Sequence, residues 1–137
     1  MSNLLAEINR VASVLHKKKG TILFRRGDAG NGVFLIRNGK VNLHLDGKTR
    51  LYPSRILGRG AIIGLPATLS GKAYSIAAEV SEDAELGFVS REDFLALMVK
   101  DTKLCLEAMN LLGKEIAAIR SAFVSYKTTK KIAARHS

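Results

Sequence analysis

The chain has 137 residues, of which 47% are hydrophobic and 25% charged, and its formal net charge is +10. This length suits one domain, and the composition argues against disorder. No apolar run reaches the roughly 20 residues that a membrane helix needs, and the N-terminus lacks the pattern of a signal peptide. We therefore expect a cytoplasmic protein that does not enter a membrane. The single cysteine, Cys105, excludes an internal disulfide and a site built from several thiolates.

An amphipathic helix is predicted over residues 3–16, because apolar residues recur there at helical spacing. The region 20–89 that follows shows short alternating segments typical of an all-β roll or sandwich. Two dipeptides of the Asx-Gly type favour tight hairpin turns and predict an antiparallel meander. The predicted turns are Asn38-Gly39 and Asp46-Gly47, and the predicted strands are 33–37, 40–45, 48–52, a segment around Ile62, 75–80 and 85–89.

Residues 90–126 are predicted to be helical. Ser90 and Asp93 form a capping signature, and a second helix is predicted from about Asp101. Apolar residues on that helix alternate four and three apart, which favours pairing with a second copy about a two-fold axis. The alternative is a helix lying along its own sheet. The pattern begins at Cys105, expected to be buried, and the predicted dimer interface is Met109, Leu112, Ile116, Ile119, Phe123 and Tyr126.

The passage 57–67 places glycines in a strand, a turn, a second strand and a short helix. Backbone amides in such a passage can face an anion. The glycines at 58, 60 and 64 loosely imitate a dinucleotide fingerprint, but they lie among predicted strands without a βαβ unit. The passage therefore points to an anion site of another kind, and the absence of charged residues from 60–67 is as informative as its glycines.

The order of these elements resembles the cyclic-nucleotide-binding domain of the Crp/Fnr regulators, from about Leu15 to Tyr126. This resemblance implies a mainly β fold: a double-stranded β-helix, or jelly-roll-like β-roll, with a flanking N-terminal helix and a long C-terminal dimerisation helix. The expected division is a domain over 1–126 and a basic tail over 127–137. The matching motifs are Lys19-Gly20, Gly27-Asp28, Phe34-Leu35-Ile36, Gly39-Lys40-Val41, Leu57-Gly58-Arg59-Gly60 and Gly64.

The phosphate-binding cassette of that family runs from a Gly-Glu pair through a short helix to an Arg-Ser/Thr-Ala triplet. In the family the helix amides and the Arg neutralise the cyclic phosphate, and the Glu binds the ribose hydroxyl. Here Leu65 stands at the Glu position and Tyr74 at the Arg position, with Lys72 nearby as a substitute cation. The predicted ligand-binding residues are Gly64, Leu65, Pro66, Ala67, Lys72, Tyr74 and Ser75.

The resemblance implies a cyclic nucleotide as the ligand, and Leu65 and Tyr74 disfavour it. A buried phosphate without its Arg costs several kcal/mol of binding free energy. An unpaired ribose hydroxyl adds about 1–3 kcal/mol, so the combined loss is on the order of a thousandfold in affinity. We therefore expect poor or no binding of cyclic AMP and cyclic GMP. Tyr74 either stacks on a flat ligand such as an aromatic acid or fills the pocket.

Catalysis is not expected, because the sequence shows no nucleophile–base pair and no paired carboxylates at a useful spacing. The three histidines are far apart, so no metal site is expected. Regulators of this family continue into a helix-turn-helix that reads DNA. Residues 128–135 look like the threshold of that domain, and we expect no specific DNA binding from this chain alone.

The expected function is a sensory or regulatory domain with a degenerate cassette and a small-molecule effector, signalling through a helix-mediated homodimer. One alternative is a ligand-free structural or interaction module. The other is a truncated transcription regulator with weak, non-specific nucleic-acid binding through its basic tail.

Overall fold

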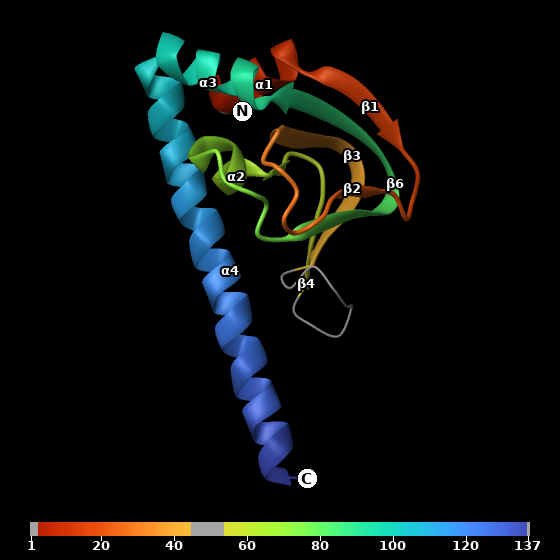
Figure 1. The fold of residues 1–137 in the computed structure, drawn as a ribbon. Coiled ribbons are helices and arrows are strands. Elements are labelled where there is room, and N and C mark those ends of the chain that lie inside the picture. The colour runs from red at the N-terminus through yellow and green to blue at the C-terminus, as the bar shows by residue number, and fades with distance from the viewer. Residues whose placement is uncertain (1–2, 45–53, 137) are drawn as a thin grey trace.

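The computed structural model describes residues 3–44 and 54–136, with side chains described up to residue 118 and at 120, 121 and 124. Strands form a curled antiparallel sheet, and helices cover one end and one side of it (Figure 1). The elements are α1 (Asn3–Val11), β1 (Ser13–Lys17), β2 (Ile22–Phe24), β3 (Gly32–His44), β4 (Ser54–Leu57), β5 (Ile62–Ile63), α2 (Leu65–Ser70), β6 (Ala77–Ser90), α3 (Arg91–Lys100) and α4 (Thr102–His136).

The sheet is organised around its two long strands, β3 and β6, which pair along almost their whole length. The strand order is β1-β6-β3-β4, and β2 and β5 add to β6 and β3. All of these pairs are antiparallel. The predicted mainly β roll with flanking helices is therefore confirmed.

Gly39 does not lie in a hairpin turn, so the turn predicted at Asn38-Gly39 is wrong. β3 runs through this dipeptide without reversing, and its register against β6 shifts there in a series of bulges. Gly39 adopts a φ of 90°, which the bulge requires just as a tight turn would. The Asn-Gly dipeptide correctly indicates a positive φ at Gly39. Whether that φ belongs to a bulge or to a turn depends on β6, the strand with which β3 pairs. The predicted turn at Asp46-Gly47 and the strand over 48–52 lie outside the described residues.

The helix predicted over 3–16 is also too long. α1 ends at Val11, and residues 13–17 form β1, which pairs with β6 from Ser13 opposite Phe88 to Lys17 opposite Ala84. The apolar residues around the end of α1 fit both the spacing of a helix and the alternation of a strand. The free edge of β6 supplies hydrogen-bond partners that the isolated segment lacks, so tertiary pairing overrides the helical pattern.

The strands predicted at 75–80 and 85–89 are one strand, β6, of 14 residues.

The prediction of the helices that follow is more accurate. The Ser90 hydroxyl accepts a hydrogen bond from the Asp93 amide at 3.1 Å, as the capping signature indicates. The segment predicted as a basic tail from residue 127 continues α4 to His136, because no proline or glycine interrupts it. No helix among the described residues is long and apolar enough to cross a membrane.

The core has two parts that meet at the cassette. One lies inside the roll and includes Phe24, Phe34 and Tyr74. The second joins α1, α3 and the first turns of α4 to the outside of the roll, and its largest buried members include Phe94 and Leu65. The helices are therefore fixed on the sheet by burial of apolar surface next to the cassette helix α2.

Gly39→Ala should lower the free energy of unfolding by about 2–4 kcal/mol. Its new Cβ would lie 2.4 Å from the Asp83 carbonyl oxygen and 2.6 Å from Ala84 Cα, in a backbone conformation that costs non-glycine residues energy. Gly27→Ala is the matched control, because its φ is 94° but no atom lies within 4 Å of the new Cβ. Urea unfolding should show a clearly smaller loss of unfolding free energy for Gly27→Ala. Equal losses would mean that the β6 backbone shifts to make room for the new methyl group at position 39.

Candidate functional site

The cassette begins at Gly64, the residue that caps α2. Its φ is 88°, and a Cβ there would lie 2.9 Å from the Gly32 carbonyl oxygen and 3.1 Å from Tyr74 Cε1. Only glycine fits this approach of three chain segments. The Gly64 carbonyl oxygen accepts hydrogen bonds from the Thr68 hydroxyl at 2.7 Å and the Thr68 amide at 3.1 Å. Pro66 lies in the first turn of α2, as expected.

Tyr74 is buried in the core of the roll, next to the start of α2. Its side chain is 5% exposed, and its ring stacks on Phe24 at a centroid distance of 3.8 Å. The hydroxyl donates to the Gly32 carbonyl oxygen at 2.7 Å and accepts from the Gly32 amide at 3.2 Å. Burial raises the pKa of this phenol, so it remains a neutral donor. The polar groups of Gly32 are thus satisfied by the protein itself.

The backbone of Tyr74 is held as firmly as its side chain. Its amide donates to the Asp28 carbonyl oxygen at 2.9 Å, and its carbonyl oxygen accepts from the Gly27 amide at 2.8 Å.

The two polar residues near Tyr74 that were predicted to contact a ligand are placed differently: Lys72 and Ser75 are exposed to solvent. Neither contributes to the cavity described below. The structure therefore brings Gly64, Ala67 and Tyr74 into one packed group and leaves the two polar members outside it.

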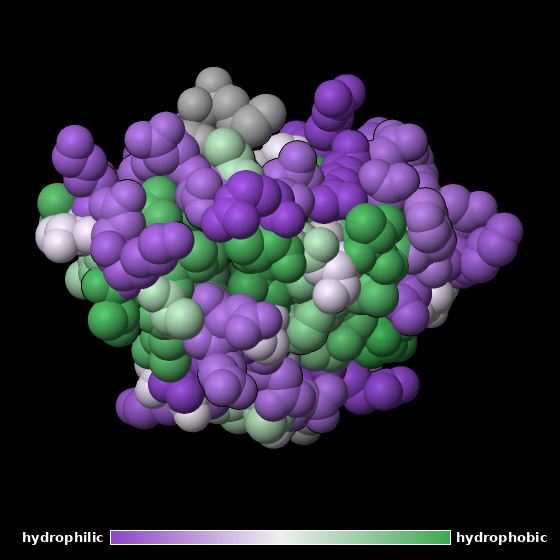
Figure 2. Space-filling view, turned by 90° about the horizontal axis from the view of Figure 1, so that it is seen from above, coloured by the Kyte–Doolittle hydropathy of each residue, from purple (hydrophilic) through white to green (hydrophobic). Residues whose placement is uncertain are grey.

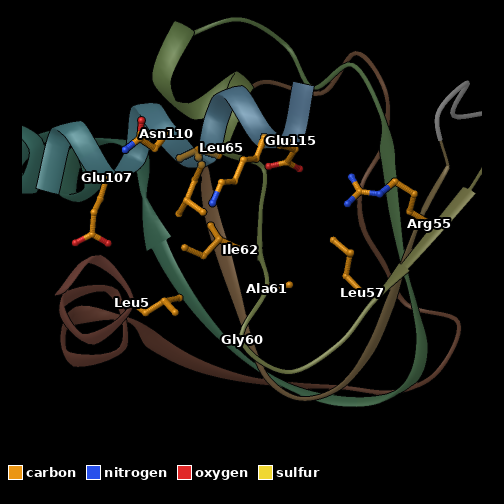
Figure 3. Close-up of a pocket in the computed structure, with 12 residues that line it drawn as sticks. Leu5, Arg55, Leu57, Gly60, Ala61, Ile62, Leu65, Glu107, Asn110 and Glu115 are labelled. Carbon is orange, nitrogen blue, oxygen red and sulfur yellow. The ribbon is translucent and has the colours of Figure 1, made fainter. Parts of the chain in front are cut away.

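Leu65, the first residue of α2, is 1% exposed and belongs to the core beneath the helices. It also lines one side of a cavity of about 510 Å³ between the roll and α4 (Figure 3). This cavity is of ordinary size for a small-molecule site. Its lining residues are Leu5, Arg55, Leu57, Gly60, Ala61, Ile62, Leu65, Glu107, Asn110, Leu111, Lys114 and Glu115.

Two charged groups face the cavity from opposite walls. In Figure 3 the guanidinium of Arg55, from β4, and the carboxylate of Glu115, from α4, point toward one another. Burial raises the pKa of Glu115 to about 7, and the positive charge of Arg55 partly opposes this rise. Sequence reasoning missed both residues. Arg55 lies in a short strand and Glu115 on a long charged helix, so neither carries a local signal.

α2 is tied to the helices that follow the roll. The Arg91 Nε donates to the Thr68 carbonyl oxygen at 2.9 Å, where α2 ends. Arg91 is the first residue of α3, which leads into α4. The cassette helix therefore has a direct polar connection to the segment that positions α4.

The exposed side of α4 carries part of the predicted dimer interface. Met109 and Ile116 are 55% and 46% exposed, whereas Leu112 is half-buried and packs against the chain's own helical core. The side chains of Ile119, Phe123 and Tyr126 lie outside the described ones. Cys105 is half-buried against the helical core, close to the expected burial.

Comparison with known proteins gives a consistent result. A model of the cyclic nucleotide-binding domain family matches residues 14–101. The cyclic AMP receptor protein of Thermus thermophilus is 36% identical over 107 residues, which are 76% of this chain and 47% of that protein. The chain thus spans less than half the length of this curated relative.

Two solved structures are similar over most of the chain. The catabolite activator protein of Thermus thermophilus has a TM-score of 0.68 and 28% identity, over 95% of this chain and 60% of that one. The EAL enzyme Bd1971 in its cAMP-bound form has a TM-score of 0.63 and 27% identity, over 89% of this chain and 33% of that one. The match over most of the roll, together with the shared fold, shows that this chain belongs to the cyclic nucleotide-binding domain family, of the type found in Crp regulators.

Proposed function

We propose that this chain is a non-enzymatic sensory domain whose cassette is closed to cyclic nucleotides and whose output is the pairing of α4 with a second copy. The observation that supports a closed cassette is the position of Tyr74. Its ring and hydroxyl occupy the space and the hydrogen bonds next to Gly64 and Gly32. A cyclic phosphate would have to displace this contact without gaining a cation in return.

Leu65 supports the same conclusion at the ribose end. Its side chain is buried among apolar neighbours and offers no acceptor to a ribose hydroxyl. Lys72, the alternative cation, is exposed and its amide donates to the Ser70 hydroxyl at 3.3 Å. Bringing its ammonium group to the cassette would not displace the phenol of Tyr74.

The proposed pairing of α4 with a second copy rests on the two different faces of this helix. Leu104, Ala108 and Leu111 recur at four and three residues and pack on the chain's own domain. Met109 and Ile116 lie roughly 100° further around the helix and remain exposed. At Gly113 an added Cβ would meet no atom within 4 Å, so a second helix can approach closely there.

The surface at one end of the molecule is of mixed polarity. Figure 2 shows the end of the molecule that carries α1 and α3, where apolar patches are separated by hydrophilic side chains. In Figure 1, α4 extends well beyond the roll, so its far half has no packing partner within the described residues. A second α4 related by a two-fold axis, the commonest symmetry of soluble homodimers, would bury this exposed stripe.

Titration calorimetry of the chain with cyclic AMP or cyclic GMP should show no binding at ligand concentrations up to about 1 mM. The loss of the cation and of the ribose acceptor lowers affinity on the order of a thousandfold. The cyclic AMP receptor protein of Thermus thermophilus serves as the positive control. The double variant Leu65→Glu with Tyr74→Arg should regain measurable affinity. Micromolar binding by the unaltered chain would contradict the closed cassette.

Ile116→Lys should weaken the dimer at least tenfold, because it places a charge at the centre of the apolar stripe. Leu106→Lys is the matched control: Leu106 is 60% exposed on the same helix but lies off the stripe. Sedimentation equilibrium from about 1 to 100 µM measures both. A monomeric unaltered chain at 100 µM, or equal effects of the two substitutions, would overturn the proposed interface.

A further inference from the structure

A second cavity, of about 450 Å³, lies on the outer face of the roll, where α1 meets β3. The turn that joins β4 to β5 and one residue of β6 complete its wall. It shares Leu5 and Gly60 with the cavity described above, but no residue of α4 and none of the cassette lines it. This volume is ordinary for a small-molecule site.

Arg37 is held against this cavity by α1. The register of β3 against β6 shifts by one residue at Arg37, which makes it the extra residue of a bulge. Its Nη2 donates to the Asn9 carbonyl oxygen, near the end of α1, at 2.9 Å. A Cβ at Gly87 would lie 3.4 Å from its Nε, so the glycine leaves room for the guanidinium. The side chain is therefore ordered before any ligand binds.

The charge of Arg37 is not neutralised by the described part of the protein. Its Nε is buried and makes no hydrogen bond there. The Asn9 carbonyl that it does contact is neutral, and the ion pairs found among the described residues join other side chains. A guanidinium fixed in this way prefers a carboxylate or phosphate that can accept two parallel hydrogen bonds.

Arg59 is brought to the same wall by the turn between β4 and β5. The Gly60 amide donates to the Ile36 carbonyl oxygen at 2.8 Å, and the Ile36 amide donates to the Ala61 carbonyl oxygen at 2.9 Å. These bonds fix the turn next to the residue that precedes Arg37. Arg59 itself is exposed, so its side chain can close on a ligand without disturbing the core.

The opposite charge is also present, on Glu85 of β6. Glu85 is half-buried, lines the cavity and forms no ion pair with either arginine in the described structure. The C-terminal carbonyl groups of α1 add partial negative charge nearby. A simple anion is repelled by these groups, whereas an ammonium group is attracted to them. The wall therefore offers one place for a negative group and another for a positive group.

We propose that this cavity binds a small α-amino acid with an apolar side chain. Arg37 and Arg59 hold its carboxylate, and Glu85 with the end of α1 holds its ammonium group. Its side chain lies against Leu5 and Leu35. Such a ligand complements both charges of the wall, while a simple acid or a simple amine complements one. This inference goes beyond the proposed function and requires neither a closed cassette nor a paired α4.

The test uses L-leucine, L-methionine and L-phenylalanine. Each is compared with its N-acetyl derivative, which lacks the ammonium charge, and with its primary amide, which lacks the carboxylate. Thermal shifts at about 10 mM ligand detect binding, and calorimetry measures affinity. At least one free amino acid should raise the melting temperature. It should bind about tenfold or more tightly than both of its derivatives, because each derivative leaves a charged group of the wall unpaired.

Two variants assign the two halves of the site. Arg59→Gln and Glu85→Gln should each lower the affinity about tenfold or more, because each removes a charge-assisted hydrogen bond. Arg25→Gln and Glu92→Gln are the matched controls, since they change exposed residues of the same charge outside the cavity and should leave the affinity unchanged. Melting of each variant without ligand shows that it is folded. Arg37 is left intact because it also bonds α1.

The location is checked by backbone amide chemical shifts of the isotope-labelled chain. The bound amino acid should shift the amides of Arg37 and Gly60 more than those of Gly64 and Tyr74.

Several results would overturn this proposal: no stabilisation by any of the three amino acids, derivatives that bind as tightly as the free amino acid, unchanged affinity in Arg59→Gln or in Glu85→Gln, or shifts centred on the cassette. None of these bears on the closed cassette or the dimer, which have their own tests above. Conversely, tight binding of cyclic AMP would overturn the closed cassette without deciding the chemistry of this cavity.

Discussion

The antiparallel pairing of β3 with β6 is the constraint from which the rest of the domain follows. It runs from Gly32 opposite Ser90 to His44 opposite Ala77, and every other strand attaches to one of these two. Because β5 pairs with β3 and leads into α2, and the chain returns from α2 into β6, both ends of the cassette are fixed by this pair. The close approach of Gly32, Gly64 and Tyr74 is a direct consequence.

Within this frame, the proposed function gives Tyr74 a structural contact in the place where an anion site would hold its ligand. Backbone amides and carbonyls at the cassette need partners once buried. In an anion site the ligand and a cation supply them, whereas here a neutral phenol and an aromatic stack do so. The exchange removes the need to bury a charge, which is costly without a full set of partners. It also makes the cassette rigid, since Tyr74 is held through both its backbone and its side chain.

In the proposed function the cassette is closed, and α4 is the element that carries the output. One face of α4, with Leu104 and Ala108, packs on the roll, while the stripe with Met109 and Ile116 stays available to a partner. Any change in how α4 sits on the roll then changes the geometry of the stripe. The bond from Arg91 to the end of α2 restrains the start of this helical segment. Differential affinity for two positions of α4 is the physical requirement for such a signal.

The sequence by itself determined what depends on residues close together in the chain: the cap at Ser90 and the family. It failed where a distant strand decides, as in the helix predicted over 3–16 and the turn at Gly39, because β6 offers pairing that no local pattern contains. The tertiary structure alone decided that Tyr74 faces inward, and that Arg55 and Glu115 meet across one cavity. Packing and burial are properties of segments brought together by folding, so no spacing within the chain could have specified them.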